Sequence, residues 1–128
     1  MIAGKAKQVL LASSIDEVKD GEVFAYKIPP TNQTHDNKIQ FLFTDISQYP
    51  IVEGSDKFRG YEEHLNLKVF FPSSYGGDFT LLQNNIIKEM KKNGYRFHDS
   101  SGVTGLPDSD RAMLSLQFWY DNLMDVAL

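Results

Sequence analysis

The chain has 128 residues, of which 41% are hydrophobic and 23% charged, a composition typical of one globular domain with a single core. Its net charge of −4 argues against a nucleic-acid-binding domain, which would normally be basic. The absence of cysteine excludes disulfides, thiolate metal sites and a cysteine nucleophile. We expect one domain over residues 1–128, without a hydrophobic run long enough to cross a membrane.

The N-terminal segment predicts an amphipathic helix from about Ile2 to Ala12, because Ala6, Val9 and Leu10 share one side of a helical wheel. Ser14 and Glu17 have the S-x-x-E spacing of a capping box, which predicts a short second helical turn.

Two strands are predicted next. The first spans Glu22 to Ile28 and ends at two consecutive prolines, which cannot donate to a β-ladder. The second spans Ile39 to Ile46. The stretch Ser47 to Gly60 then predicts a long connection containing Tyr49-Pro50 and Gly54, and connections of this length are often functional.

The most regular pattern in the chain runs from Glu62 to Phe71 and alternates with a period of two. Successive strand side chains point to opposite faces, so the pattern predicts a long strand with one buried and one wet face. One face would carry Glu63, Leu65, Leu67, Val69 and Phe71, and the other Glu62, His64, Asn66, Lys68 and Phe70.

The last third predicts a helix with Asp78 as its N-cap, ending at Asn93-Gly94. A strand from Tyr95 to Asp99 follows, then a flexible loop from Ser100 to Asp110, and a final strand from Ala112 to about Asp121. This order predicts an α+β fold: a mostly antiparallel sheet of about four to five strands with two helices packed on one face.

No catalytic or metal motif accompanies these elements. His35, His64 and His98 lack metal-ligand spacing, although a site assembled by the fold stays open, as does a crude acid/base cluster of His35, Asp36 and Asp45. Glycines before the helix at Asp78 lack the spacing of a phosphate loop. We therefore expect no enzyme activity, no cofactor and no metal.

Aromatic residues near strand ends are the most informative side chains outside the core pattern. Phe70, Trp119 and Tyr120 lie near the ends of long predicted strands, and Trp119 lies on the face opposite the main hydrophobic stripe of its strand. Two interpretations stay open: a second small core, or a subunit interface, where tryptophan and tyrosine are enriched.

The run TDISQYPIVEGSDKFRGYEEHLNLKVFFPSSYGGDF resembles a family of virion proteins of siphophages that infect Gram-positive hosts. The matching pieces are Thr44-Asp45-Ile46, Tyr49-Pro50, Gly54 and the strand Leu65 to Pro72, followed by a turn and a helix. The final strand, Ala112 to Tyr120, is similar to that family's closing strand. The resemblance covers roughly Val23 to Tyr120 and rests on structural motifs.

That family resembles the tail terminators, also called tail completion or tail-to-head joining proteins. The resemblance implies a homo-hexameric ring that caps the finished tail tube, stops its polymerisation and meets the head connector. The implied partners are other copies of the chain, the major tail tube protein and the head completion or connector protein. DNA would pass through the ring without specific binding, which the negative charge suits. The protein would be assembled in the host cytoplasm and end in the virion, with no membrane partner.

Interface residues are expected in two loops and at aromatic strand ends. The first loop offers Tyr49, Asp56, Lys57, Phe58 and Arg59, and the second offers Val103, Thr104, Leu106 and Asp108. The aromatic positions are Phe70, Tyr75, Trp119 and Tyr120. A long edge strand is expected to supply contacts by pairing across subunits. The alternatives are another neck, head completion or minor tail protein, or a small bacterial enzyme or ligand-binding domain.

Overall fold

The computed structural model describes residues 2–53, 57–106 and 109–123. The fold is α+β, as predicted, and consists of three helices and one five-stranded sheet among these residues. In chain order the elements are α1 (Ala3–Leu11), α2 (Asp16–Asp20), β1 (Glu22–Ala25), β2 (Gln40–Glu53), β3 (Lys57–Phe71), α3 (Phe79–Lys92), β4 (Arg96–Gly105) and β5 (Ala112–Leu123).

The sheet is mixed but mostly antiparallel, with the strand order β1-β2-β3-β5-β4. Only β1 and β2 pair in parallel. The longest strand, β3, lies in the middle of the sheet and pairs with both β2 and β5. The expectation that a long edge strand is available for pairing across subunits is therefore wrong for β3, because the edges are β1 and β4.

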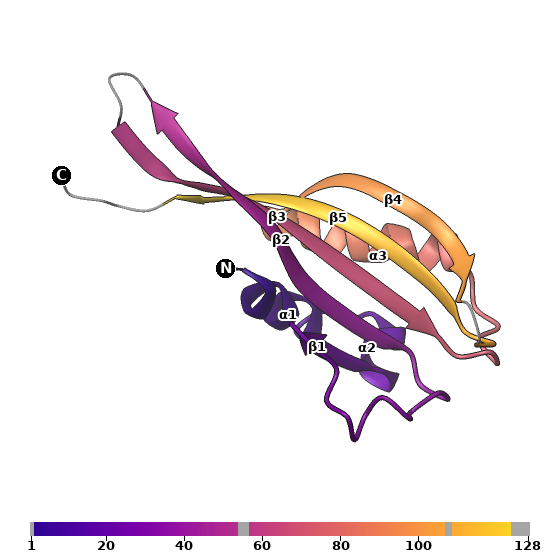
Figure 1. Cartoon of the computed structure of the whole chain (residues 1–128). Helices are drawn as coiled ribbons and strands as arrows, with labels where there is room; N and C mark the ends of the chain where they lie inside the picture. Colours follow the sequence, from indigo (N-terminus) through magenta and orange to yellow (C-terminus); the bar gives the residue numbers. More distant parts are fainter. Residues whose placement is uncertain (1, 54–56, 107–108, 124–128) are drawn as a thin grey trace.

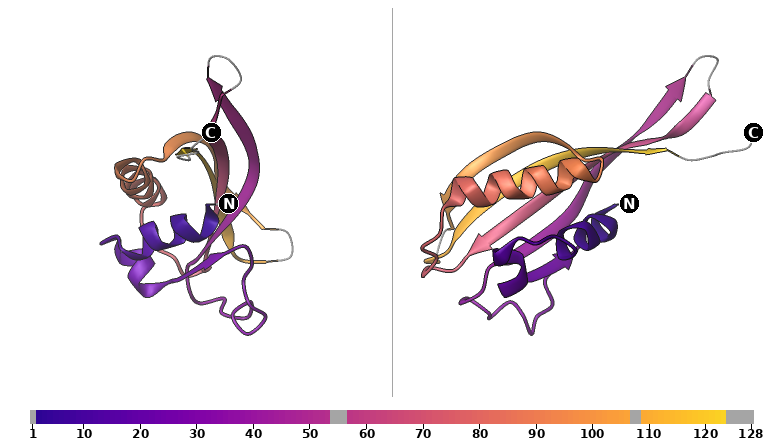
Figure 2. Two further views of the ribbon diagram at one scale, coloured as in Figure 1. Left: turned by 90° about the vertical axis from the view of Figure 1, so that its left-hand side faces the viewer. Right: turned by 180° about the vertical axis from the view of Figure 1, so that it is seen from behind.

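Both long helices cover one face of the sheet, and the left view in Figure 2 shows the sheet with the helices on the same side of it. The predicted alternation of β3 is confirmed, since its inward residues from Glu63 to Phe71 are at most 1% exposed. They meet Leu10 of α1 and Ile86 of α3, both fully buried. We call this side the covered face and the other side the open face.

Local capping signals gave mixed results. Asp78 caps α3 as predicted, accepting a hydrogen bond from the backbone of Leu81 at 3.1 Å, and Gly94 ends the helix with φ of +90°. The capping box at Ser14 is wrong, because Ile15 is the N-cap of α2 and no side chain caps it. The N-terminus of α1 is capped across the fold instead: Asp45 of β2 accepts from the backbone of Ile2 at 2.9 Å.

The two predicted loops are largely strands, which corrects the sequence prediction. Within Ser47 to Gly60, β2 continues to Glu53 and β3 begins at Lys57. Residues 100–105 extend β4, whose irregular pairing between Ser100 and Val103 accommodates Gly102 at φ +70°. The first strand is shorter than predicted, because Tyr26 adopts φ of +74° immediately after β1. Asp56 and Asp108 lie outside the described residues.

The outer halves of β2 and β3 form a long hairpin that projects beyond the body (Figure 1). We call residues 46–53 and 57–61 the arm. β1 pairs with β2 only as far as Phe43, and β5 reaches β3 only as far as Gly60. Neither α1 nor α3 covers the outer arm in the views of Figures 1 and 2. Among the described residues, the end of the arm is thus a two-stranded ribbon that neither long helix covers.

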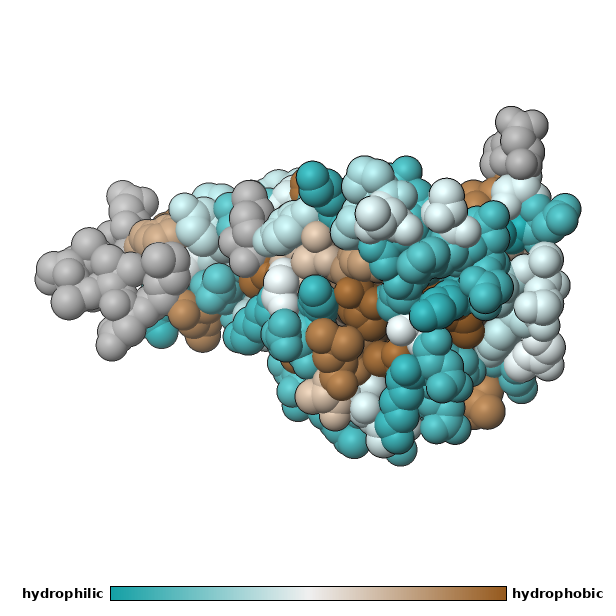
Figure 3. All heavy atoms as spheres, turned by 90° about the horizontal axis from the view of Figure 1, so that it is seen from below, coloured by the Kyte–Doolittle hydropathy of each residue, from teal (hydrophilic) through white to brown (hydrophobic). Residues whose placement is uncertain are grey.

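The body itself carries a hydrophobic patch on the side seen from below, framed by hydrophilic side chains (Figure 3). Among the described residues, no helix has the length and hydropathy needed to span a membrane.

Candidate assembly surface

The structure divides the predicted interface residues into two groups at opposite ends of the sheet. Tyr49, Phe58 and Arg59 lie on the arm, and Lys57 begins β3 there, although its side chain is outside the described part. The other end, where β3 and β4 finish and β5 starts, carries Phe70, Tyr75, Val103, Thr104 and Leu106. Figure 1 shows the two ends far apart along the length of the sheet. We call the second group's location the far end.

The arm presents large hydrophobic side chains to solvent. Tyr49 is 53% exposed and Val52 is 56% exposed, and Phe58 packs edge-on against Tyr61 with ring centroids 5.0 Å apart. A two-stranded ribbon is marginally stable in water without a further strand or helix to cover it. An exposed ribbon of this composition is typical of a segment that packs against another molecule.

A β-bulge at the base of the arm is built around Gly60. Ile51 pairs with Gly60 and Val52 with Phe58, so the register of the two strands shifts between these pairs. Gly60 has φ of +140°, and a Cβ there would lie 2.1 Å from the backbone oxygen of Asn122. Glycine is therefore required for β5 to approach β3 this closely. Bulges increase the local twist of a strand pair, so this one sets the direction of the arm.

A row of four neighbouring rings crosses the open face, one ring from each of β2, β3, β5 and β4; three of them are stacked and the Tyr49 ring is tilted by 47° to its neighbour. We call Tyr49, His64, Trp119 and His98 the aromatic row. The Trp119 indole lies between the two imidazoles, with centroid distances of 4.3 Å to His64 and 4.1 Å to His98. Tyr49 follows at 4.9 Å on the other side of His64. Its place in the row confirms that Trp119 faces away from the main core. The Trp119 side chain is half-buried.

Polar side chains hold His64 in the row at both nitrogens. Its Nε2 lies 2.9 Å from a carboxylate oxygen of Glu62, and its Nδ1 lies 3.2 Å from the hydroxyl of Ser47. The guanidinium of Arg96 bridges two carboxylates: it lies 3.4 Å from an oxygen of Glu62 and 3.1 Å from an oxygen of Asp121. The hydrogen bond to Asp121 raises the pKa of Arg96, although burial opposes it.

Tyr120 does not share the surface of Trp119. Its ring packs on the covered side against Tyr95 at 4.6 Å, and the ammonium group of Lys5 lies 4.5 Å from its centroid. The tyrosine at position 95 is 1% exposed, and its burial raises its pKa above the ordinary value. Tyr120 thus fixes the N-terminal helix to the sheet, rather than extending the open face.

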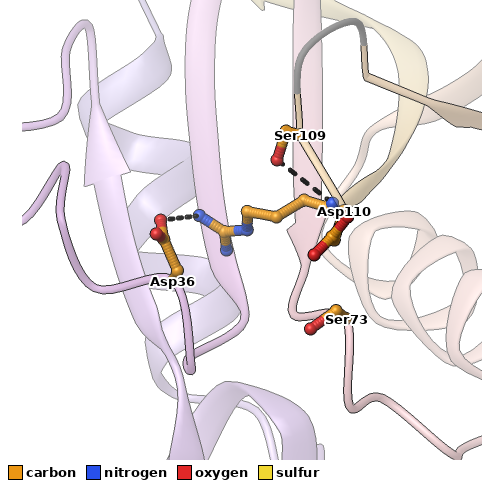
Figure 4. A pocket seen from close by; sticks show the side chains of 5 residues that line it. Asp36, Ser73, Ser109 and Asp110 are labelled. Atoms are coloured by element: carbon orange, nitrogen blue, oxygen red, sulfur yellow. Dashed lines mark hydrogen bonds and ion pairs between the residues drawn. The ribbon is translucent and has the colours of Figure 1, made fainter.

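A polar pocket of about 540 Å³ lies at the far end, lined by Asp36, Ser73, Ser109, Asp110 and Arg111. We call it the far-end pocket, and Figure 4 shows its side chains. The buried side chain of Arg111 links several segments at this pocket. Its guanidinium donates to the backbone oxygens of Lys38 at 2.7 Å, Phe70 at 3.2 Å and Phe71 at 3.3 Å. It also donates to Gln40 at 3.0 Å. Burial lowers the pKa of Arg111, although Asp36 opposes this.

The segment leading to this pocket is anchored to β1 by Glu22. The carboxylate accepts from Asn32 at 2.5 Å and from Gln40 at 3.0 Å, and it lies 3.0 Å from His35. Desolvation raises the pKa of Glu22, but these hydrogen bonds outweigh it, so the net pKa is lowered. At the same end, burial and the hydrogen bond to Glu17 raise the pKa of Tyr75 to about 12.

Sequence reasoning missed two sets of residues here. The sequence spacing of His64 and His98 gave no sign that they enclose Trp119. The shared wet faces of three strands were the available signal, but the strand order was unknown. Arg111 gave no local signal, because its acceptors lie 40 to 73 positions away in the sequence. The predicted cluster of His35, Asp36 and Asp45 is not formed as a unit, since His35 pairs with Glu22 and Asp45 caps α1.

Among the described residues, no group of three or more histidine, aspartate or glutamate side chains is arranged to hold a metal ion. The chain matches no protein-family model, and no curated protein matches it. Its function is therefore inferred from its residues and their geometry.

Proposed function

We propose that the protein is a structural virion component, a tail terminator that forms a hexameric ring at the head-proximal end of a long non-contractile phage tail. The ring would stop polymerisation of the tail tube and join the tail to the head connector. The proposal starts from the sequence resemblance and does not assign any catalytic step to the chain.

One observation supports a ring more than any other: most interface residues expected from sequence fall at two opposite ends of the sheet, while Trp119 and Tyr120 lie between the ends. A ring needs heterologous contacts, in which two different surfaces of the subunit meet head to tail and the rotation closes. A chain with an exposed arm at one end and a shaped pocket at the other has two such surfaces.

Contacts through the free edges of the sheet are less favoured than contacts through faces and ends. β2 carries Pro50 on the stretch where β3 is its only described partner strand, and proline lacks the N–H that an added strand needs. The other edge, β4, is interrupted by two irregularities in its pairing. Such features protect sheet edges from strand addition. The aromatic row, which faces outward, is the better candidate for contact with a neighbouring subunit or the tube.

The proposal is tested by adding the purified protein to polymerising tail tube protein and measuring tube lengths by electron microscopy. We expect capped tubes that stop growing, with a ring visible at one end. Tubes that grow equally long with and without the protein, and that carry no ring, would contradict it. A related neck or head completion protein would instead bind the head connector without changing tube length.

A hydrolase is the second candidate, because Ser47, His64 and Glu62 form a hydroxyl–imidazole–carboxylate chain. Against it, Ser47 lies within a strand and pairs directly with His64 in the ladder. A nucleophilic serine more often sits on a turn, where backbone N–H groups can stabilise the oxyanion. Labelling of Ser47 by a fluorophosphonate, abolished in His64→Gln, would support the hydrolase; lack of labelling would remove it.

A further inference from the structure

The two lateral sides of the sheet both expose hydrophobic side chains. β1 and β4 form the two edges, and Figure 1 shows them on opposite sides of the molecule. Tyr26 follows the end of β1, and Ile46 lies on β2 just beyond its pairing with β1. They are 54% and 50% exposed, and we call them the edge pair. The hydrophobic patch of Figure 3 lies on the same side, because that view is from below, where β1 lies in Figure 1.

The β4 side carries a cleft of about 550 Å³ between α3 and β4, which we call the side cleft. Phe97 in this cleft is 42% exposed, and Ile87 is partly buried against the main core. The cleft thus offers hydrophobic walls to a side chain of another molecule, with two cations among its lining residues. The lining residues are Ile87, Lys91, Gly94, Tyr95, Arg96 and Phe97.

The edge pair and the side cleft lie at the same level of the sheet. A row of paired residues crosses it from Asp45 through Leu65 and Phe118 to Phe97. Ile46 follows Asp45 at one end of this row, and Phe97 of the side cleft is at the other end. A heterologous contact closes into a ring only when it involves no shift along the rotation axis; otherwise it builds an open helix. Surfaces at one level on opposite sides of the sheet meet this condition when the strands run along the axis.

Tyr26 is held in a backbone conformation that its side chain disfavours. Its φ of +74° is an outlier for a bulky residue, and its N–H donates to the backbone oxygen of Phe43 at 2.8 Å. Strained residues of this kind cluster at binding sites, where the surrounding structure holds them. Glycine or asparagine adopts a positive φ at lower cost, so the local backbone does not require a tyrosine here.

Charge also favours the pairing of these two surfaces. Desolvation raises the pKa of Tyr26, and the carboxylates of Asp45 and Glu63 raise it further, so the surroundings of the phenol are negative. On the other side of the sheet, Lys91 and Arg96 line the cleft. Arg96 is held by two carboxylates of its own chain, whereas Lys91 lies exposed at the end of α3. An ammonium group placed over an aromatic ring is attracted to the face of that ring.

We propose that the edge pair of one copy docks in the side cleft of the next copy, with Lys91 over the ring of Tyr26. The occupant is a second copy of this chain, and the contact is heterologous. It is made by side chains rather than by ladder hydrogen bonds, so the irregular pairing that protects β4 from strand addition does not oppose it. This inference deepens the proposed function, on which closure into a ring rests, and it leaves the two ends of the sheet to the tail tube and the head connector.

The contact is tested by site-specific cross-linking, because the chain has no cysteine of its own. Lys27→Cys places a thiol beside Tyr26, and Asn84→Cys places one on α3, a helical turn before Ile87 of the cleft. The two variants, one carrying an affinity tag, are mixed and treated with a short bis-maleimide. The matched control replaces Asn84→Cys with Asn85→Cys, an exposed asparagine of the same helix that lines a different pocket, beside α2.

We expect at least tenfold more mixed cross-linked dimer with Asn84→Cys than with Asn85→Cys. Equal yields, or none from either mixture, would overturn the proposal.

Tyr26→Asn separates docking from folding. Asparagine adopts a positive φ more readily than tyrosine, so the variant should melt at the same or a higher temperature. In the Lys27→Cys chain it should lower the cross-linking yield at least tenfold, because the docking ring is lost. An unchanged yield would overturn the proposal and assign Tyr26 to the fold alone.

Lys91 provides a second variant at an exposed position of the cleft, where folding is little affected. Lys91→Gln in the Asn84→Cys chain should lower the yield at least threefold, and Lys91→Arg, which keeps the cation, should preserve it. Equal yields for Lys91→Gln and Lys91→Arg would contradict the contact between the cation and the ring.

Tube length measured with the same variants separates this inference from the proposed function. Cross-linking without tube termination would leave the contact standing and reject the terminator. Termination without cross-linking would reject the contact and leave the terminator standing.

Discussion

The two ends of this molecule are stabilised in different ways. The far end is held by buried polar networks, in which Arg111 and Glu22 connect the ends of β3 and β5 with residues 26–39. The arm is a ribbon in whose outer part β2 and β3 are the only strands that pair in the described part of the chain. Substitutions at the far end should therefore affect folding, whereas those on the arm should affect association. That contrast is expected of a pre-formed receiving site and a projecting element that is stabilised when it docks.

The largest effect is expected for Arg111→Met. The variant removes a buried guanidinium and leaves the backbone oxygens of Lys38, Phe70 and Phe71 without their donor. We expect the free energy of unfolding to fall by about 3 kcal/mol, measured by urea denaturation. Val52→Ala on the arm, at a side chain that is 56% exposed, is the matched control and should change it by less than about 0.5 kcal/mol. Similar losses in both variants would remove the contrast between the ends.

Gly60→Ala should have the next largest effect, because it strains the base of the arm. The residue has φ of +140°, and the added Cβ would meet the backbone oxygen of Asn122 at 2.1 Å. We expect a loss on the order of 2 kcal/mol in thermal or urea unfolding. Gly76→Ala, where a Cβ would meet nothing within 4 Å, should be close to neutral. A neutral Gly60→Ala would show that the bulge does not hold β5 against the arm.

Trp119→Ala should affect association more than folding. The indole is half-buried between two imidazoles on the open face, so its loss should lower unfolding free energy by about 1 kcal/mol. Self-association, followed by light scattering, should weaken at least tenfold, and Trp119→Phe should recover most of it. If Trp119→Ala lowers the free energy of unfolding and the free energy of association by the same amount, Trp119 belongs to a second core instead.

The smallest effect is a pH dependence at the far end. Because the folded-state pKa of Glu22 is lowered, its carboxylate stabilises the fold above its unfolded pKa, and this stability is lost as the pH falls through the folded value. Glu22→Gln should lower stability at neutral pH by about 1 kcal/mol and flatten the acid side of the profile. Unfolding curves measured between neutral and acidic pH would show this. If the free energy of unfolding falls with decreasing pH as steeply in the variant as in the original chain, other carboxylates cause that fall.

Local signals in the sequence predicted the body of the fold well. Alternation from Glu62 to Phe71 identified the buried face of β3, and Asp78 and Gly94 marked the ends of α3. These signals depend on neighbours a few positions away, so they can be read without the fold.

The arm and the far-end pocket could not be predicted from short sequence segments, because both depend on residues that are far apart in the chain. Pro50 and Gly60 are residue types that suggest a loop. Pro50 is tolerated in β2 because that side of the strand has no described partner strand. Gly60 is tolerated in β3 because it forms a bulge. The aromatic row requires the strand order β2-β3-β5-β4, and Arg111 finds its acceptors across the fold. The sequence therefore did not predict that most of the expected interface residues divide between two ends of the sheet.

The mass of the assembled particle is the most direct test of the account. Native mass spectrometry or light scattering, with and without tail tube protein, should reveal a closed particle of six copies, six times the 14.6 kDa of one chain. Trp119→Ala should shift it towards monomers. A protein that stays monomeric under both conditions, or that forms only a dimer, would contradict the ring.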